Sequence, residues 1–138
     1  MTDTTSPIVR QAACSCGQLT LTATGEPVRV SVCHCRACQR RTGSAFGVQA
    51  RFGRDQIAVE GRCETYRRTA DSGNRVSFHF CPDCGATVYY RLDPMPDVIA
   101  VPVGAFADPD FPAPGVSVYE ARQYDWLQLL PEDIAHYD

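Results

Sequence analysis

The 138-residue chain contains no lysine: all 13 of its basic residues are arginines. Sixteen acidic residues outnumber them and give a formal net charge of −3. Non-specific nucleic-acid binding needs a strongly basic surface, so this charge balance argues against a nucleic-acid partner. The longest apolar run, residues 98–103, is interrupted by Pro102 and is much shorter than the roughly 20 residues that cross a bilayer. The sequence therefore predicts no membrane partner.

The sequence also lacks the signatures of several common enzyme classes. It has no glycine-rich phosphate loop, no serine-triad signature and no paired-carboxylate pattern. Its start, MTDTTSPIVRQAA, has no charged segment followed by an apolar one, so we expect no secretory signal and a cytoplasmic location. Its length and its 44% hydrophobic residues suit one domain with its own core. We expect a flexible N-terminus over residues 1–8 and a single domain over residues 9–138.

Short stretches of alternating apolar residues predict a mainly β fold. Leu19, Leu21 and Ala23 share one face of the first such stretch. In the second, valines alternate with Arg29 and Ser31 and the strand runs into a cysteine. The predicted strands cover residues 18–24, 28–33, 45–52, 56–60, 64–68, 75–80, 86–92, 98–103 and 116–120.

Helix signals are few. Residues 36–42 are expected to form two helical turns that end at Gly43 in a left-handed cap, and residues 131–135 one further turn. Trp126 is followed by leucines, and we expect it to be part of the core.

Eight cysteines are the most informative feature, and seven of them fall in three tight clusters. Disulfides are rare in the reducing cytoplasm, so metal binding is the better interpretation. Two thiolates two or three residues apart can converge on one tetrahedral ion when the chain turns tightly between them. The clusters are Cys14-Ser-Cys16, Cys33-His-Cys35-Arg-Ala-Cys38 and Cys81-Pro-Asp-Cys84.

The spacing favours a division of the seven cysteines into four and three. Cys81 and Cys84, followed by glycine, have the form of a zinc knuckle, and Cys14 and Cys16 are the natural partners that complete a closed structural site. The remaining triplet then offers three ligands and an open position, as catalytic zinc does. A reduced thiol cluster, a disulfide switch and iron–sulfur ligation are the alternatives for the triplet.

Three other residues have less specific signals. His34 lies between two ligands of the triplet, so its ring is expected to point away from their metal, and its functional interpretation is a proton shuttle. His79 is expected to be a surface or packing residue. Cys63 stands alone and is expected to be a buried apolar cysteine.

The order of these motifs resembles that of the glutathione-dependent formaldehyde-activating enzyme family, whose domain is shared with centromere protein V. The resemblance runs over residues 9–130, from Cys-x-Cys-Gly through Cys-His-Cys-x-x-Cys to Phe-Cys-x-x-Cys-Gly, and the late Val-Tyr-Glu and Trp126 are similar too. It implies a β-tent fold of antiparallel sheets pinned by zinc, with one or two short helices. It implies two zinc ions per chain, one structural on Cys14, Cys16, Cys81 and Cys84 and one catalytic on Cys33, Cys35 and Cys38.

The activity implied by the resemblance is that of a carbon–sulfur lyase, which joins formaldehyde to glutathione to give S-hydroxymethylglutathione. The expected partner is a small thiol or aldehyde substrate, with glutathione as one candidate. The competing hypothesis is a non-catalytic zinc-binding or interaction module in which another residue or a partner chain fills the fourth position of the triplet. Cys63 and His34 are the candidates within the chain. A methionine sulfoxide reductase would need a late catalytic cysteine, and none follows Cys84.

Overall fold

The computed structural model of the chain describes residues 6–129 and 131–138. Within these ranges the protein is mainly β, with one short α-helix, α1 (Arg36–Thr42), and three 3-10 turns, η1 (Arg54–Gln56), η2 (Val103–Phe106) and η3 (Glu120–Arg122). The strands are β1 (Val9–Ala13), β2 (Thr20–Thr24), β3 (Arg29–Cys33), β4 (Gly47–Gly53), β5 (Ile57–Glu60), β6 (Glu64–Thr69), β7 (Arg75–Phe80), β8 (Thr87–Leu92), β9 (Val98–Pro102), β10 (Val116–Val118) and β11 (Ala135–His136). No helix in the described ranges is long and apolar enough to cross a membrane.

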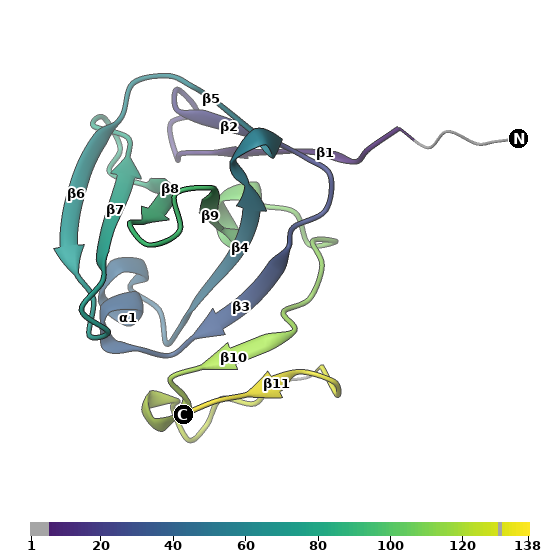
Figure 1. Ribbon diagram of the computed structural model, residues 1–138, viewed down its shortest axis with the longest axis vertical. Coiled ribbons are helices and arrows are strands. Elements are labelled where there is room, and N and C mark those ends of the chain that lie inside the picture. Colours follow the sequence, from purple (N-terminus) through teal and green to yellow (C-terminus); the bar gives the residue numbers. More distant parts are fainter. Residues whose placement is uncertain (1–5, 130) are drawn as a thin grey trace, which may run out of the picture.

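The strands form two sheets. The small sheet has the order β1-β2-β5, and the large sheet has the order β11-β10-β3-β4-β9-β8-β7-β6. The large sheet bends round so that β6 and β7 stand opposite β3 and β4, with α1 at one end of the space between them and the small sheet across the other end (Figure 1). Neighbouring strands are antiparallel except at β10, which pairs in parallel with both β3 and β11.

The main core lies between the two sheets. Leu19, Leu21 and Ala23 are fully buried, which confirms the face that their alternation predicted. They pack in one cluster with side chains of the large sheet, including Phe52 and Val88. A second, smaller cluster lines the inside of the bend and contains Val76, Phe78, Tyr90 and Ala100. The bend therefore has an apolar wall on the β7–β8 side.

Most of the expected elements are confirmed. Helix α1 covers the predicted residues and ends at Gly43, whose φ of 68° is the left-handed cap. The nine predicted strands all occur, with bounds shifted by up to two residues. The structure adds β1 and β11, which the alternation did not indicate. Of the N-terminal segment 1–8, residues 1–5 lie outside the described ranges.

Three expectations are wrong. Residues 131–135 form no helical turn; β11 begins at Ala135 instead, because the chain there pairs with β10. Trp126 is 73% exposed and stacks edge-on against Tyr124 at the surface, so it is not part of the core. Cys63 is exposed, because it lies in the connection that leads to the edge strand β6.

Gly61, the first residue of that connection, provides a test of how closely the chain after β5 approaches the chain before β2 within the small sheet. Its φ is +108°, and a Cβ there would overlap with the Gln18 carbonyl oxygen and lie 2.9 Å from the Leu19 Cα. Gly73 has a similar φ of +89° but open space around it. We expect Gly61→Ala to lower the free energy of unfolding by about 3 kcal/mol, against about 1 kcal/mol for Gly73→Ala, because only the first substitution adds a backbone clash to the strain of a left-handed residue. Urea unfolding of both variants measures the difference, and equal losses would contradict the close approach.

Candidate metal centres and the pocket beside the cysteine triplet

Four cysteines that are far apart in the sequence come together between the two sheets. The Sγ atoms of Cys14, Cys16, Cys81 and Cys84 all lie within 4.8 Å of one another. Cys16 Sγ is 3.6 Å from Cys14 Sγ and 3.7 Å from Cys81 Sγ. A tetrahedral ion with metal–sulfur bonds of about 2.3 Å separates its ligands by about 3.8 Å, so this all-sulfur donor set fits a zinc-sized ion.

A tight turn within each pair of cysteines orients the two sulfur atoms toward the centre of the cluster. Gly17 and Gly85 follow the second cysteine of their pairs, and both have positive φ values, 83° and 81°. The turns point backbone N–H groups at sulfur: Leu19 N donates to Cys14 Sγ and Asp83 N to Cys81 Sγ, each at 3.3 Å. Cys14 directly follows β1 and Cys81 directly follows β7, so the cluster links the small sheet to the large one.

Gln18 is the side chain that supports this cluster most directly. Its Nε2 donates to Cys81 Sγ at 2.9 Å and to the Arg62 carbonyl oxygen at 2.8 Å, while its Oε1 accepts from Arg62 N at 3.0 Å. Burial by itself would raise the pKa of Cys81, but the Gln18 hydrogen bond and the backbone N–H groups that follow lower it to about 6. Gln18 therefore stabilises the thiolate form that binds metal.

The second cluster is built where β3 meets α1. Cys33 is the last residue of β3, Cys35 caps the N-terminus of α1, and Cys38 lies in the first helical turn. Their Sγ atoms also lie within 4.8 Å of one another, and Cys35 Sγ accepts a hydrogen bond from Cys38 N at 3.3 Å. No further Cys, His, Asp or Glu of residues 6–129 and 131–138 joins this set. The triplet can hold a metal ion and leave one side open.

The three sulfur atoms are electrostatically coupled. Hydrogen bonds from the Cys33 and Cys38 thiols strongly lower the pKa of Cys35, and the nearby Arg68 charge adds to that shift. The same hydrogen bond with Cys35 raises the pKa of Cys33. One thiolate is therefore stable in this cluster, whereas three together need a bound cation.

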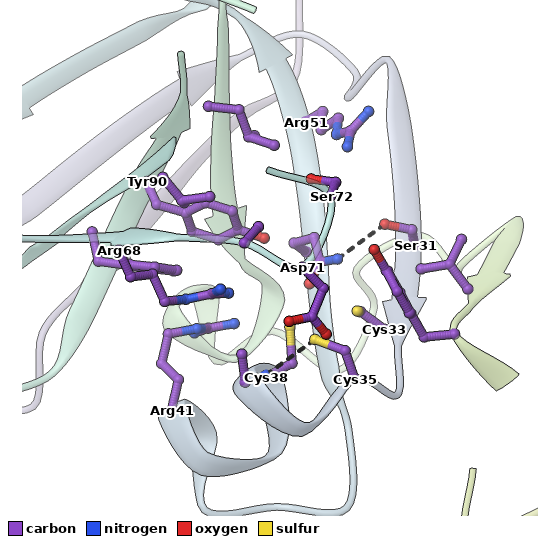
Figure 2. Close-up of a pocket in the computed structure, with 18 of the residues that line it drawn as sticks. Ser31, Cys33, Cys35, Cys38, Arg41, Arg51, Arg68, Asp71, Ser72 and Tyr90 are labelled. Carbon is purple, nitrogen blue, oxygen red and sulfur yellow. Dashed lines mark hydrogen bonds between the residues drawn. The ribbon is translucent and has the colours of Figure 1, made fainter. Parts of the chain in front are cut away.

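The triplet forms one end of a pocket of about 250 Å³ inside the bend of the large sheet. Arg41 and Arg68 direct their guanidinium groups toward Cys38, while Arg51 lies at the end of the pocket away from the cysteines (Figure 2). Four arginines line the pocket, Arg29, Arg41, Arg51 and Arg68, against a single acidic residue, Asp71. The pocket is therefore suited to an anionic ligand.

Two of these arginines are held by the aromatic wall. The Arg41 guanidinium lies 5.4 Å from the ring centre of Phe78 and 5.3 Å from that of Tyr90, and the Arg68 guanidinium lies 5.2 Å from Phe78. Cation–π contacts of this kind restrain both side chains beside the triplet. Tyr119 lines the same pocket and has a φ of 57°, which is unusual for an aromatic residue. Burial and the nearby Cys33 sulfur raise the pKa of Tyr119, so its hydroxyl remains a hydrogen-bond donor.

His34 faces away from this pocket. Its ring is fully buried, its Nε2 lies 2.9 Å from Ser117 Oγ on β10, and it is not among the pocket-lining residues. Its contacts fix the position of the chain between Cys33 and Cys35, and its proton-shuttle role stays a prediction. His79 is buried, stacked on Tyr89, which agrees with a packing role.

Several pocket residues were missed in the sequence. The valines of residues 28–33 predict the strand, but its other face carries Arg29, Ser31 and Cys33, and this face lines the pocket. That alternation was a usable signal, because a row of polar side chains that ends at a metal ligand points to a site. Nothing in the sequence indicated Arg68 or Asp71, which reach the pocket from another part of the fold. Tyr119 belongs to the Val-Tyr-Glu motif that the resemblance includes, but that motif did not indicate a place in the pocket.

The fold and the two clusters define a mainly β protein with two candidate cysteine metal centres, one closed and one open to a pocket. The family model of the glutathione-dependent formaldehyde-activating enzyme matches residues 9–122, and the chain belongs to that family. A Rhodobacter sphaeroides protein of known crystal structure superposes with a TM-score of 0.55 at 16% sequence identity, over 93% of this chain and 99% of that chain. At that identity the likeness shows a shared fold. No curated protein matches the chain significantly.

Gly47 offers a test of how the triplet is accommodated. It pairs with Cys33 across β3 and β4, and a Cβ there would lie 3.3 Å from Cys38 Cβ and 3.6 Å from Cys38 Sγ. We expect Gly47→Ala to weaken metal retention by the triplet and Gly47→Val to weaken it further, because each added group pushes Cys38 away from its partners. Metal per chain after dialysis measures this effect, with the four-cysteine cluster as the internal control.

Gly115→Ala is the matched control, because a Cβ at Gly115 meets nothing within 4 Å. Full metal retention in Gly47→Val would show that the triplet does not depend on the space beside Cys38.

Proposed function

We propose that this protein is a zinc-dependent enzyme of the carbon–sulfur lyase type that acts on a small thiol–aldehyde adduct, as in glutathione-dependent formaldehyde activation. The observation that carries the proposal is the triplet of Cys33, Cys35 and Cys38, which has an open side and forms the end of a pocket. Three protein ligands with a free position distinguish catalytic zinc sites from structural ones. Membership of the family supports the same type of reaction.

Zinc is the metal that best suits both clusters, with one ion in each. Thiolate-only donor sets favour soft metals, and tetrahedral sulfur sites are typical of zinc or of iron–sulfur centres. The four-cysteine cluster is assigned as the structural site, because its ligands hold two sheets together and the set is complete. The triplet is assigned as the catalytic site. Reduced cysteines suit a reducing compartment, and the cytoplasm is the location we propose.

A zinc ion in the triplet, when bound, supplies a Lewis acid that favours the thiolate form of a substrate thiol and polarises an aldehyde oxygen. The chain itself binds and orients the reactants. In the forward reaction the substrate sulfur forms a bond to the aldehyde carbon, and the thiol proton ends on the aldehyde oxygen. The Tyr119 hydroxyl is assigned as the hydrogen-bond donor to that oxygen, and the apolar wall of Phe78 and Tyr90 limits access of water.

The alternative is a non-catalytic zinc module, for which Cys63 and His34 are the candidate fourth ligands within the chain. Cys63 is exposed beside Tyr89, and the His34 ring is turned toward Ser117. Neither belongs to the triplet's ligand set. These positions weigh against a second site closed by this chain's own residues and support the enzyme hypothesis.

The experiment combines metal content with catalysis. We expect about two zinc ions per chain as purified and about one in Cys35→Ser, with the fold retained, because the structural cluster is untouched. Exchange of formaldehyde between water and glutathione, followed by NMR, should be accelerated by the unmodified protein and not by Cys35→Ser. Cys63→Ser is the matched control and should keep both metal ions and activity.

Two results would overturn the assignment. A singly loaded Cys35→Ser that still accelerates exchange would remove the triplet from the reaction. A doubly loaded unmodified protein without activity, and with only protein ligands on both ions by X-ray absorption, would favour the non-catalytic module.

A further inference from the structure

The floor of the pocket lies on three residue pairs across β3 and β4, and every member of these pairs except Gly47 lines the pocket. Cys33 is paired with Gly47, Ser31 with Gln49, and Arg29 with Arg51. Because side chains alternate along a strand, all of these residues project to the same side of the sheet. At about 3.3 Å per residue, the arginine pair is about 13 Å along the strand from Cys33, measured between Cα atoms. The cysteine triplet and the arginine pair are thus opposite ends of one floor.

The Arg29–Arg51 pair is an unfavourable arrangement in the free protein. Like charges directly opposite each other destabilise a sheet, and both arginines are partly buried. The Nε atoms of both are buried without a hydrogen-bond partner, and no ion pair within the described ranges includes either residue. Burial and the neighbouring Arg29 charge lower the pKa of Arg51. An anion bound between the two guanidinium groups would relieve this repulsion.

Gln49, in the middle of the floor, is also incompletely satisfied. Its Nε2 donates to Ser31 Oγ at 3.3 Å, but its Oε1 is buried without a partner. A buried acceptor of this kind needs an N–H or O–H donor. The floor therefore presents, in order, a metal-binding triplet, a hydrogen-bond acceptor and a double positive charge.

We propose that Arg29 and Arg51 form an anion subsite that binds a carboxylate of the thiol substrate, with Gln49 accepting a hydrogen bond from an N–H group between the thiol and that carboxylate. The inference rests on the proposed function only in placing the substrate sulfur at the cysteine triplet. The new element is the assignment of Arg29, Gln49 and Arg51 as the residues that select a thiol whose carboxylate is separated from sulfur by an amide, as in glutathione, over short thiols and aminothiols. Arg29 and Arg51 thereby determine specificity without touching the reacting atoms.

Binding is tested by calorimetry on the full-length, metal-loaded protein with four probes: glutathione, its diethyl ester, cysteamine and inorganic phosphate. We expect Arg51→Gln and Arg29→Gln each to weaken glutathione binding by about 10- to 100-fold, the usual loss of a charged hydrogen-bonded contact. The diethyl ester and cysteamine should bind weakly to the unmodified protein and be insensitive to both variants. Arg54→Gln is the matched control. Arg54 is an exposed arginine that directly follows β4, and this variant should bind glutathione as the unmodified protein does.

A second measurement separates recognition from a structural role. Removing one of two facing charges should raise the melting temperature of the ligand-free protein while binding becomes weaker. In the exchange reaction, KM should rise with little change in kcat. Should Arg51→Gln fail to fold, Arg51→Lys keeps the charge but loses the forked geometry and should still bind glutathione less tightly.

The outcomes also separate this inference from the proposed function. Glutathione binding that depends on Arg51, in a protein without exchange activity, supports the subsite and refutes the enzyme. Exchange activity with glutathione binding unchanged in both arginine variants refutes the subsite and leaves the enzyme. If the two arginine variants lose phosphate binding but keep glutathione binding, the pair is a site for inorganic anions and the inference is overturned. A diethyl ester that binds the unmodified protein as tightly as glutathione would overturn it too.

Discussion

Convergence of cysteine sulfur atoms from distant parts of the chain is the constraint on which the rest of this structure depends. Cys14 and Cys16 follow β1 in the small sheet, and Cys81 and Cys84 follow β7 in the large one. Four sulfur atoms within 4.8 Å of one another are compatible with folding only if a cation offsets their charge or most of them stay protonated. The cluster thereby ties the two sheets to each other, and Gln18 adds a direct link from the small sheet to Cys81 and to the chain before β6.

Repulsion between like charges is also important in the pocket, where the charges are positive instead of negative. Arginines surround the second cysteine cluster, and their partners within the described ranges are aromatic rings rather than carboxylates. Arg41 and Arg68 face sulfur atoms that become anionic on metal binding, so their charges are balanced within the site. Arg29 and Arg51 have no such counterpart, and their repulsion is a cost that the fold carries in the free state. Such uncompensated features are typical of binding sites, where the ligand supplies what the protein lacks.

Backbone geometry sets where these groups meet. Cys33 ends β3, and the helix that begins after Cys35 turns Cys38 back toward it. The absence of a side chain at Gly47 leaves room for Cys38, and the left-handed conformation of Tyr119 follows a strand whose last residue, Val118, is paired with Cys33. The open side of the triplet thus results from several local conformations that agree with one another.

The identities and spacing of the cysteines determined both candidate ligand sets, because two short cysteine pairs and one triplet can be combined sensibly in only one way. Alternation determined most of the strands, and Gly43 determined the end of α1. Only the tertiary structure decided the exposure of Trp126 and Cys63. Each lies in a connecting segment, and whether such a segment is covered depends on which strands are central in the sheet and which lie at its edge. It also decided the pocket: Arg29 and Arg51 are 22 positions apart in the sequence and become neighbours through the β3–β4 register, while Arg68 and Asp71 arrive from the opposite side of the bend. A strand's own pattern shows which residues share a face, but the charge that a pocket collects depends on how the sheet bends.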